Sequence, residues 1–171
     1  GAANATVGVH TAMQDSVPMI LFVGQVGTDV KGREAFQEVD YAAFFGPLAK
    51  WAVEIDDVNR VPEIISRAWA VALSGRPGPV VVALPEDMLV ATSDCQPSVP
   101  VTVPEPGVSA MIADQMQAML AAAERPVVLF GGSRWTVESA RAMESFAAAH
   151  DLPLVAAFRF HDIIDNHCPA Y

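Results

Sequence analysis

The sequence predicts an α/β fold built on parallel strands. Short β-rich apolar runs alternate with longer stretches of helical period, and proline and glycine residues separate them. The continuous apolar runs at residues 18–23 and 79–84 are typical of strands buried on both faces of a parallel sheet. With 52% hydrophobic and 18% charged residues over 171 positions, the chain has the composition of a globular protein.

The first half is predicted to alternate helix and strand from its start. Residues 4–14 have the pattern of a helix, and the strand at residues 18–23 then ends at Gly24. A second helix starts at Asn59, carries Pro62 in its first turn and stops at Gly75, before the strand at residues 79–84. We expect about three strands in this half.

A proline-rich stretch at residues 91–108 separates the two halves. It contains Pro97, Pro100, Pro104 and Pro106 without any periodic apolar pattern, so it should be stiff and extended. We therefore predict one domain over residues 1–90, a linker over residues 91–108 and a second domain over residues 109–171.

The second half repeats the α/β rhythm with fewer elements. A helical stripe leads to a strand at residues 126–130, a helix at residues 136–149 and a strand at residues 153–157. The stripe consists of Ile112, Met116, Met119, Leu120 and Ala123. Open parallel sheets usually have more strands than either half offers, so we expect the chain to be a piece of a longer protein.

Net charge, apolar runs and cysteine spacing indicate which partners and which cell compartment to expect. Ten basic against twenty acidic residues give a net charge of −10, which disfavours nucleic acid and anionic membranes as partners. No apolar run approaches the roughly 20 residues that a membrane-spanning helix needs. Cys95 and Cys168 lie far apart without metal-ligand or disulfide-framework spacing, so we expect a cytoplasmic protein.

Chemistry alone offers few candidate sites, and two of them have alternative interpretations. The glycine turn at residues 131–133 could approach a phosphate at a helix N-terminus, or could serve only as a tight turn. Arg76 could meet an anionic ligand or a carbonyl, or belong to a rigid turn with Gly75 and Pro77. No metal site is predicted. The acidic and histidine residues at 161–167 are best interpreted as a solvated loop.

An ordered set of motifs resembles the thiamine diphosphate-dependent enzymes of the acetolactate synthase type. The motifs run in the family's order and spacing along essentially the whole chain. They are Gly1-Ala2-Ala3-Asn4, Gly24-Gln25-Val26, Ala35-Phe36-Gln37-Glu38, Lys50-Trp51, Ser74-Gly75-Arg76-Pro77-Gly78-Pro79-Val80 and Leu84-Pro85-Glu86-Asp87.

The resemblance implies a fold and an assembly. Residues 1–90 resemble part of the family's pyrimidine-binding domain, a three-layer parallel-sheet domain, and residues 109–171 resemble the start of its Rossmann-like central domain. The activating glutamate and the segment that holds the diphosphate through Mg²⁺ match no part of this chain, so we expect the chain alone to be inactive. The family places its cofactor between subunits, which implies a homodimer or a larger homo-oligomer.

The resemblance also implies a reaction and site residues. The cofactor's ylide attacks a 2-oxo acid, carbon dioxide leaves, and a second carbonyl compound captures the product, with thiamine diphosphate as the electron sink. Phe36 and Gln37 match positions at the active-site entrance, and we take both as the catalytic candidates. Asn4 and Gln25 match segments near the cofactor. Arg76 matches an arginine that touches FAD in flavin-containing members, although the same motif occurs in relatives without flavin.

One position departs from the family's pattern. Pro85-Glu86-Asp87 stands where acetolactate synthases usually have Pro-Lys-Asp, which reverses a charge near the mouth of the substrate channel. The resemblance thus implies a carboligase or decarboxylase of 2-oxo acids whose substrate and acceptor are open. The alternative from a different class is a non-catalytic α/β module that binds a nucleotide or serves a structural role.

Overall fold

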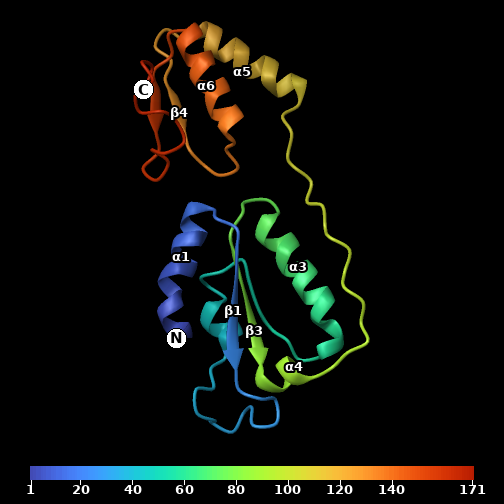
Figure 1. Ribbon diagram of the computed structural model, residues 1–171. Coiled ribbons are helices and arrows are strands. Elements are labelled where there is room, and N and C mark those ends of the chain that lie inside the picture. The colour runs from blue at the N-terminus through green and yellow to red at the C-terminus, as the bar shows by residue number, and fades with distance from the viewer. The chain divides into compact units, whose positions relative to one another are not determined.

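The computed structural model describes all of residues 1–171, which form two compact units, Gly1–Pro104 and Glu105–Tyr171. The division falls inside the proline-rich stretch, and no helix or strand lies between Val90 and Ala110 (Figure 1). None of the helices has the length and apolarity that crossing a bilayer requires.

The first unit contains a three-stranded parallel sheet in the order β1-β3-β2. This arrangement confirms the predicted α/β class with parallel strands. Its elements are η1 (Ala2–Ala5), α1 (Thr6–Asp15), β1 (Met19–Gln25), α2 (Tyr41–Phe45), β2 (Trp51–Glu54), η2 (Val58–Arg60), α3 (Val61–Leu73), β3 (Pro79–Pro85) and α4 (Glu86–Val90).

Strand β3 forms the centre of this unit. Its residues are buried except for the partly buried Leu84, and alternate side chains enter two different clusters. Val81 and Ala83 pack with α1 and α2, whereas Val80 and Val82 pack with α3. Figure 1 shows β1 and β3 side by side between α1 and α3. The continuous apolar run therefore reflects burial on both faces, as the sequence predicted.

Several short elements of this unit were not located from the sequence, among them strand β2 and helices α2 and α4. Strand β2 is only four residues long and each of them is half-buried, so it lacks the apolar run of a central strand. Helix α2 is five residues long and is capped by Asp40, whose carboxylate accepts a hydrogen bond from Ala43 N at 2.9 Å.

Two basic side chains, Arg76 and Lys50, cap the C-terminal ends of helices at the amino edge of the sheet. Arg76 donates to the carbonyl oxygens of Met13 and Gln14 at 2.8 and 2.9 Å and to Ser16 Oγ at 2.8 Å, at the end of α1. Lys50 donates to the carbonyl oxygens of Val71 and Ser74 at the end of α3. Positive charge at these positions satisfies carbonyls that a helix leaves without partners and complements the helix dipole.

The second unit is a smaller parallel pair with two helices. It contains α5 (Ala110–Ala122), β4 (Val128–Phe130), α6 (Val137–Ala149) and β5 (Leu154–Ala156), with β4 and β5 paired in parallel. The core is formed by Phe130, Ala147, Leu152, Leu154 and Ile164. All four elements lie where the sequence predicted them, within two residues at each end.

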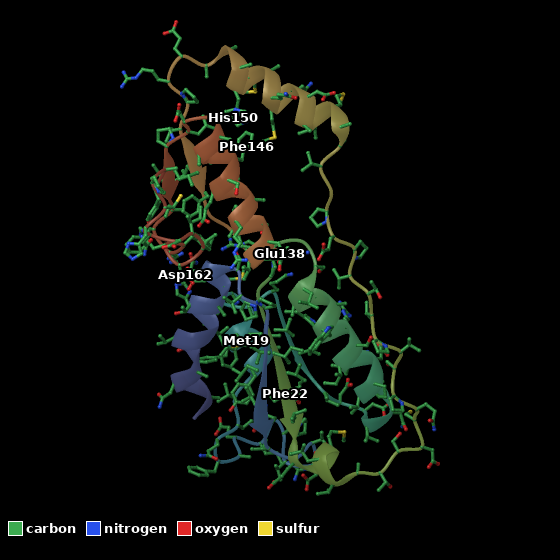
Figure 2. All side chains as sticks on the ribbon, turned by 45° about the horizontal axis from the view of Figure 1, so that its top comes forward. Met19, Phe22, Glu138, Phe146, His150 and Asp162 are labelled. Atoms are coloured by element: carbon green, nitrogen blue, oxygen red, sulfur yellow. The ribbon has the colours of Figure 1, made fainter.

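The apolar stripe of α5 lies outside the core of this unit. No α5 residue is buried, and Met116 and Leu120 line a groove of about 700 Å³ together with Phe146 and His150. Figure 2 labels Phe146 on α6 and His150 directly after its last residue, and the ring centroids of the two lie 4.7 Å apart. The predicted helix is therefore present, but its apolar face does not pack as a core helix does.

The contacts of Arg76 predict a role in stability. Arg76→Ala removes three hydrogen bonds at the end of α1, so we expect the free energy of unfolding to fall by about 1–2 kcal/mol. Lysine should restore only part of this loss, because an ammonium group cannot reproduce the planar fork of donors. Denaturant unfolding measures the effect, with Arg60→Ala as a control that removes only exposed ion pairs. Unchanged stability in Arg76→Ala would contradict this role.

Candidate active-site cleft

A cleft of about 620 Å³ lies at the carboxyl edge of the first unit's sheet. The end of β1, the start of α4, helix α2 and the loop between β1 and α2 contribute its walls. Its lining residues are Gly1, Ala2, Ala3, Val23, Gly24, Gln25, Val26, Phe36, Gln37, Val39, Tyr41, Phe44, Leu84, Glu86 and Leu89. Ligand sites in open α/β sheets favour this edge, because the loops that follow parallel strands converge there.

Gln25 is the last residue of β1 and is buried, with 6% of its surface exposed. Its Nε2 donates to the carbonyl oxygen of Val39 at 2.7 Å and to Glu54 Oε2 at 3.1 Å. Its Oε1 accepts from Val26 N at 3.0 Å. Both amide hydrogens are thus used within the protein, which leaves one acceptor site on Oε1 of this cleft-lining residue.

The loop at residues 26–40 carries Phe36 and Gln37 and is held by three carboxylates. Asp87, just after β3, accepts from Thr28 N at 3.0 Å and also from Thr28 Oγ1. Glu54, at the end of β2, accepts from Lys31 Nζ at 2.6 Å. Glu38, within the loop, accepts from Gly32 N at 2.5 Å and Ala35 N at 3.1 Å.

These contacts shift the ionisation of the groups that make them. The hydrogen bonds from Thr28 lower the pKa of Asp87, and those from the Gly32 and Ala35 amides lower the pKa of Glu38. The hydrogen bond to Glu54 raises the pKa of Lys31. The shifts of the pKa values of Asp87, Glu38 and Lys31 all favour the charged form, so the contacts of these three groups are favoured at neutral pH.

Phe36 and Gln37, which are neighbours in the chain, both line the cleft, and their catalytic role stays a prediction. Phe36 is 89% exposed, so its ring has no role in the core. Gln37 has φ of 69° and Glu34 has φ of 56°, a left-handed conformation that costs energy for residues other than glycine. This backbone, in a loop held by hydrogen bonds on both sides of the pair, places residue 37 at the wall of the cleft.

The other two predicted site residues lie elsewhere. Asn4 is exposed in η1 and is not among the residues that line the cleft, although Gly1, Ala2 and Ala3 are. Arg76 precedes β3 and therefore lies at the opposite edge of the sheet from the cleft. Its contact with FAD stays a prediction, and the contacts present in this chain are those with the end of α1.

The glycine turn of the second unit is explained by packing. A Cβ on Gly131 would lie 2.9 Å from Ala157 Cβ, and Gly132 has φ of 84°. The following helix is capped by Thr136, whose Oγ1 accepts from Ser139 N at 3.1 Å. Of the nearby polar residues, His161 Nδ1 pairs with Tyr171 Oη at 2.8 Å, and no group of three or more metal-ligating side chains is arranged to hold an ion.

Comparison with known proteins assigns the first segment to a family. Residues 1–44 match the family model described as thiamine pyrophosphate enzyme, N-terminal TPP binding domain. This segment includes β1, Gln25 and the loop that carries Phe36 and Gln37. The chain belongs to the thiamine pyrophosphate enzyme family. The resemblance on which the site residues were predicted is thereby confirmed at the level of the family.

Relatives of the acetolactate synthase type match this family member along most of its length. The acetolactate synthase isozyme 2 large subunit of Escherichia coli (strain K12) is 31% identical over 171 residues, which cover 100% of this chain and 31% of the relative. Glyoxylate carboligase of Escherichia coli O157:H7 is 34% identical over 86% of this chain and 25% of the relative. The probable acetolactate synthase large subunit of Methanocaldococcus jannaschii is 37% identical over 77% of this chain and 24% of the relative. The chain thus spans less than a third of the length of these relatives.

The residues that hold the loop of this family member were not selected from the sequence as site residues. They are Lys31, Glu38, Glu54 and Asp87. Asp87 stood within a family motif, so its place directly after a strand could have identified it. Lys31 and Glu54 are 23 positions apart, and no local sequence pattern indicates that they form a pair.

The geometry of Gln37 predicts that its side chain serves activity more than stability. In the full-length protein, Gln37→Ala should lower turnover or change substrate preference while leaving the melting temperature close to that of the wild type. Gln37→Gly removes the same side chain but relieves the left-handed backbone, so it should lose the same activity without loss of stability. Calorimetry and steady-state kinetics measure both effects. Unfolding of both variants with unchanged kinetics per folded molecule would contradict this assignment.

Proposed function

We propose that this chain is part of a thiamine diphosphate-dependent enzyme that decarboxylates a 2-oxo acid or joins it to a second carbonyl compound. The observation that carries the proposal is the cleft, because Gln25, Phe36 and Gln37 meet there within the segment that matches the thiamine pyrophosphate model. The names of the relatives, acetolactate synthase and glyoxylate carboligase, support the same class of reaction.

The residues of the cleft fit one end of the cofactor. Val23, Tyr41, Phe44 and Leu84 offer apolar walls on which a planar heteroaromatic ring can pack. Gln25 Oε1 retains acceptor capacity, and the Gln37 amide carries both donors and an acceptor. When bound, thiamine diphosphate supplies the electron sink that accepts the electron pair left by decarboxylation. The anchored loop holds Gln37 against the same space, where it can orient a substrate carbonyl or carboxylate.

The remaining cofactors and the assembly are further parts of the proposal. We assign Mg²⁺ to no residue of this chain, and propose that it joins the diphosphate to a segment outside these 171 residues. FAD is proposed only as an optional group. We further propose a homo-oligomer with the cofactor at the subunit interface, and a cytoplasmic location, which the two free thiols Cys95 and Cys168 favour.

The proposal predicts cofactor-dependent turnover by the full-length protein. With thiamine diphosphate and Mg²⁺, it should release carbon dioxide from a 2-oxo acid, and removal of the cofactor by dialysis should abolish the reaction reversibly. The 171-residue chain assayed alone should show none. A set of 2-oxo acids with coupled detection of carbon dioxide makes the measurement. A folded, full-length oligomer that binds no thiamine diphosphate by calorimetry would refute the proposal.

The charge of Glu86 predicts which acceptor the cleft prefers. Glu86 lines the cleft, whose lining residues include neither lysine nor arginine, so its carboxylate repels a second anionic substrate. We expect wild type to favour a neutral aldehyde over a 2-oxo acid as the acceptor. Glu86→Lys should shift the ratio of kcat/KM values toward the anionic acceptor by roughly five- to tenfold, since reversing one exposed charge changes the interaction with an anion by on the order of 1 kcal/mol.

Salt and an uncharged variant serve as controls for this prediction. Raising the ionic strength should reduce the shift, because screening weakens exposed charges. Glu86→Gln should give an intermediate ratio. A ratio that is the same in all three proteins would mean that Glu86 does not select the acceptor.

A further inference from the structure

Glu54 occupies a connecting position beside the cleft without lining it. It is the last residue of β2, and its side chain is 14% exposed. Its two carboxylate oxygens have different partners: Oε2 accepts from Gln25 Nε2 at 3.1 Å, and Oε1 accepts from Lys31 Nζ at 2.6 Å. One side chain therefore joins the end of a strand to the middle of the loop.

The sheet register explains why a long side chain is needed here. Gln25 pairs with Pro85 and Glu54 pairs with Ala83, so β3 lies between the strands that carry the two residues. Strands flanking a common neighbour are about 10 Å apart, a span that only two long side chains can bridge. Glutamate at residue 54 supplies both the reach and the charge that Lys31 requires.

The contacts of Glu54 bracket the Phe36–Gln37 pair along the chain. Lys31 precedes the pair and is bound directly. Val39 follows the pair, and its carbonyl accepts from the same Gln25 amide that donates to Glu54. Glu54 is thus connected to the loop on both sides of the two residues that the cleft presents.

We propose that Glu54 is a positioning residue, which fixes the place of Gln37 at the cleft by holding Lys31 directly and Val39 through Gln25. The expected effect of Glu54 on catalysis rests on the proposed function. Its role in holding the loop rests only on the contacts within this chain. Glu54 touches neither the cofactor nor the substrate in this scheme.

The backbone contacts separate this role from a role in sheet stability. Strand β2 is paired with β3 through its backbone, and Ile55 N donates to the carbonyl oxygen of Ala83 at 3.0 Å just beyond the strand. None of these bonds involves the Glu54 side chain. Loss of the carboxylate should therefore release the loop while β2 and β3 stay paired.

Hydrogen exchange of the full-length protein tests the proposal. In Glu54→Ala, the amides of residues 30–39 should exchange about tenfold faster or more, whereas those of β3 should keep their protection. Glu54→Asp keeps the charge but loses reach, so it should behave like alanine. Glu54→Gln keeps an acceptor for Gln25, so it should retain protection near Val39 and lose it near Lys31.

Two further variants control the experiment. Lys31→Met removes only the contact on the Lys31 side and buries no new group, so it carries the test if Glu54→Ala fails to fold. Glu63→Ala removes an ion pair outside the loop, the more exposed one with Arg60 at 3.2 Å, and should leave the exchange of the loop unchanged.

Kinetics then connect the loop to catalysis. Glu54→Ala should lower kcat by roughly ten- to a hundredfold with a smaller effect on cofactor affinity, because a misplaced group costs most in the reaction step. Unchanged loop exchange in Glu54→Ala and Lys31→Met would overturn the positioning role whatever the activity. Faster loop exchange with unchanged kcat would overturn its link to catalysis. An inactive wild type with faster loop exchange in the variants would count against the proposed function alone.

Discussion

The burial of β3 between two parallel neighbours is the constraint on which the rest of the first unit depends. A strand that packs on α1 and α2 through one face and on α3 through the other can carry no charged side chain along its length. Polar chemistry is therefore confined to the two edges of the sheet. All three strands end at the carboxyl edge. Gln25, Glu54 and Asp87, which lie at or just after these ends, hydrogen-bond there to the loop at residues 26–40.

The two edges use charge for different purposes. At the amino edge, Arg76 and Lys50 bind carbonyl oxygens that end α1 and α3, and their cations have no role in the cleft. At the carboxyl edge, Glu54 and Asp87 bind a loop that has no regular structure of its own. Both edges thus depend on charged groups that hydrogen-bond to partners distant in sequence. At the amino edge these bonds fix the ends of helices, and at the carboxyl edge they fix the loop of the site.

The sequence predicted those parts of the fold that local pattern encodes. The apolar runs identified β1 and β3, and Pro62 with Gly75 marked the limits of the helical segment that contains α3. Strand β2 was not predicted, because its four half-buried residues show neither a continuous apolar run nor a clear alternation of apolar and polar side chains. The Glu54 contacts could not be predicted, since they depend on the register of two strands across a third. Gln37 was selected as a site residue mainly by resemblance, because an amide beside an aromatic residue in a polar, glycine-containing segment indicates by itself little more than a surface loop.

The hydrogen bonds that hold the loop must offset the cost of its strained backbone. A left-handed conformation at Glu34 and Gln37 costs on the order of 1 kcal/mol each, and it persists only where the surroundings determine it. Phe36, held exposed between them, adds an unfavourable apolar surface. The carboxylates of Glu38, Glu54 and Asp87 are each hydrogen-bonded to a different part of the loop and hold its backbone in this conformation. The cleft is thus organised before any ligand arrives, which reduces the entropy that binding must overcome.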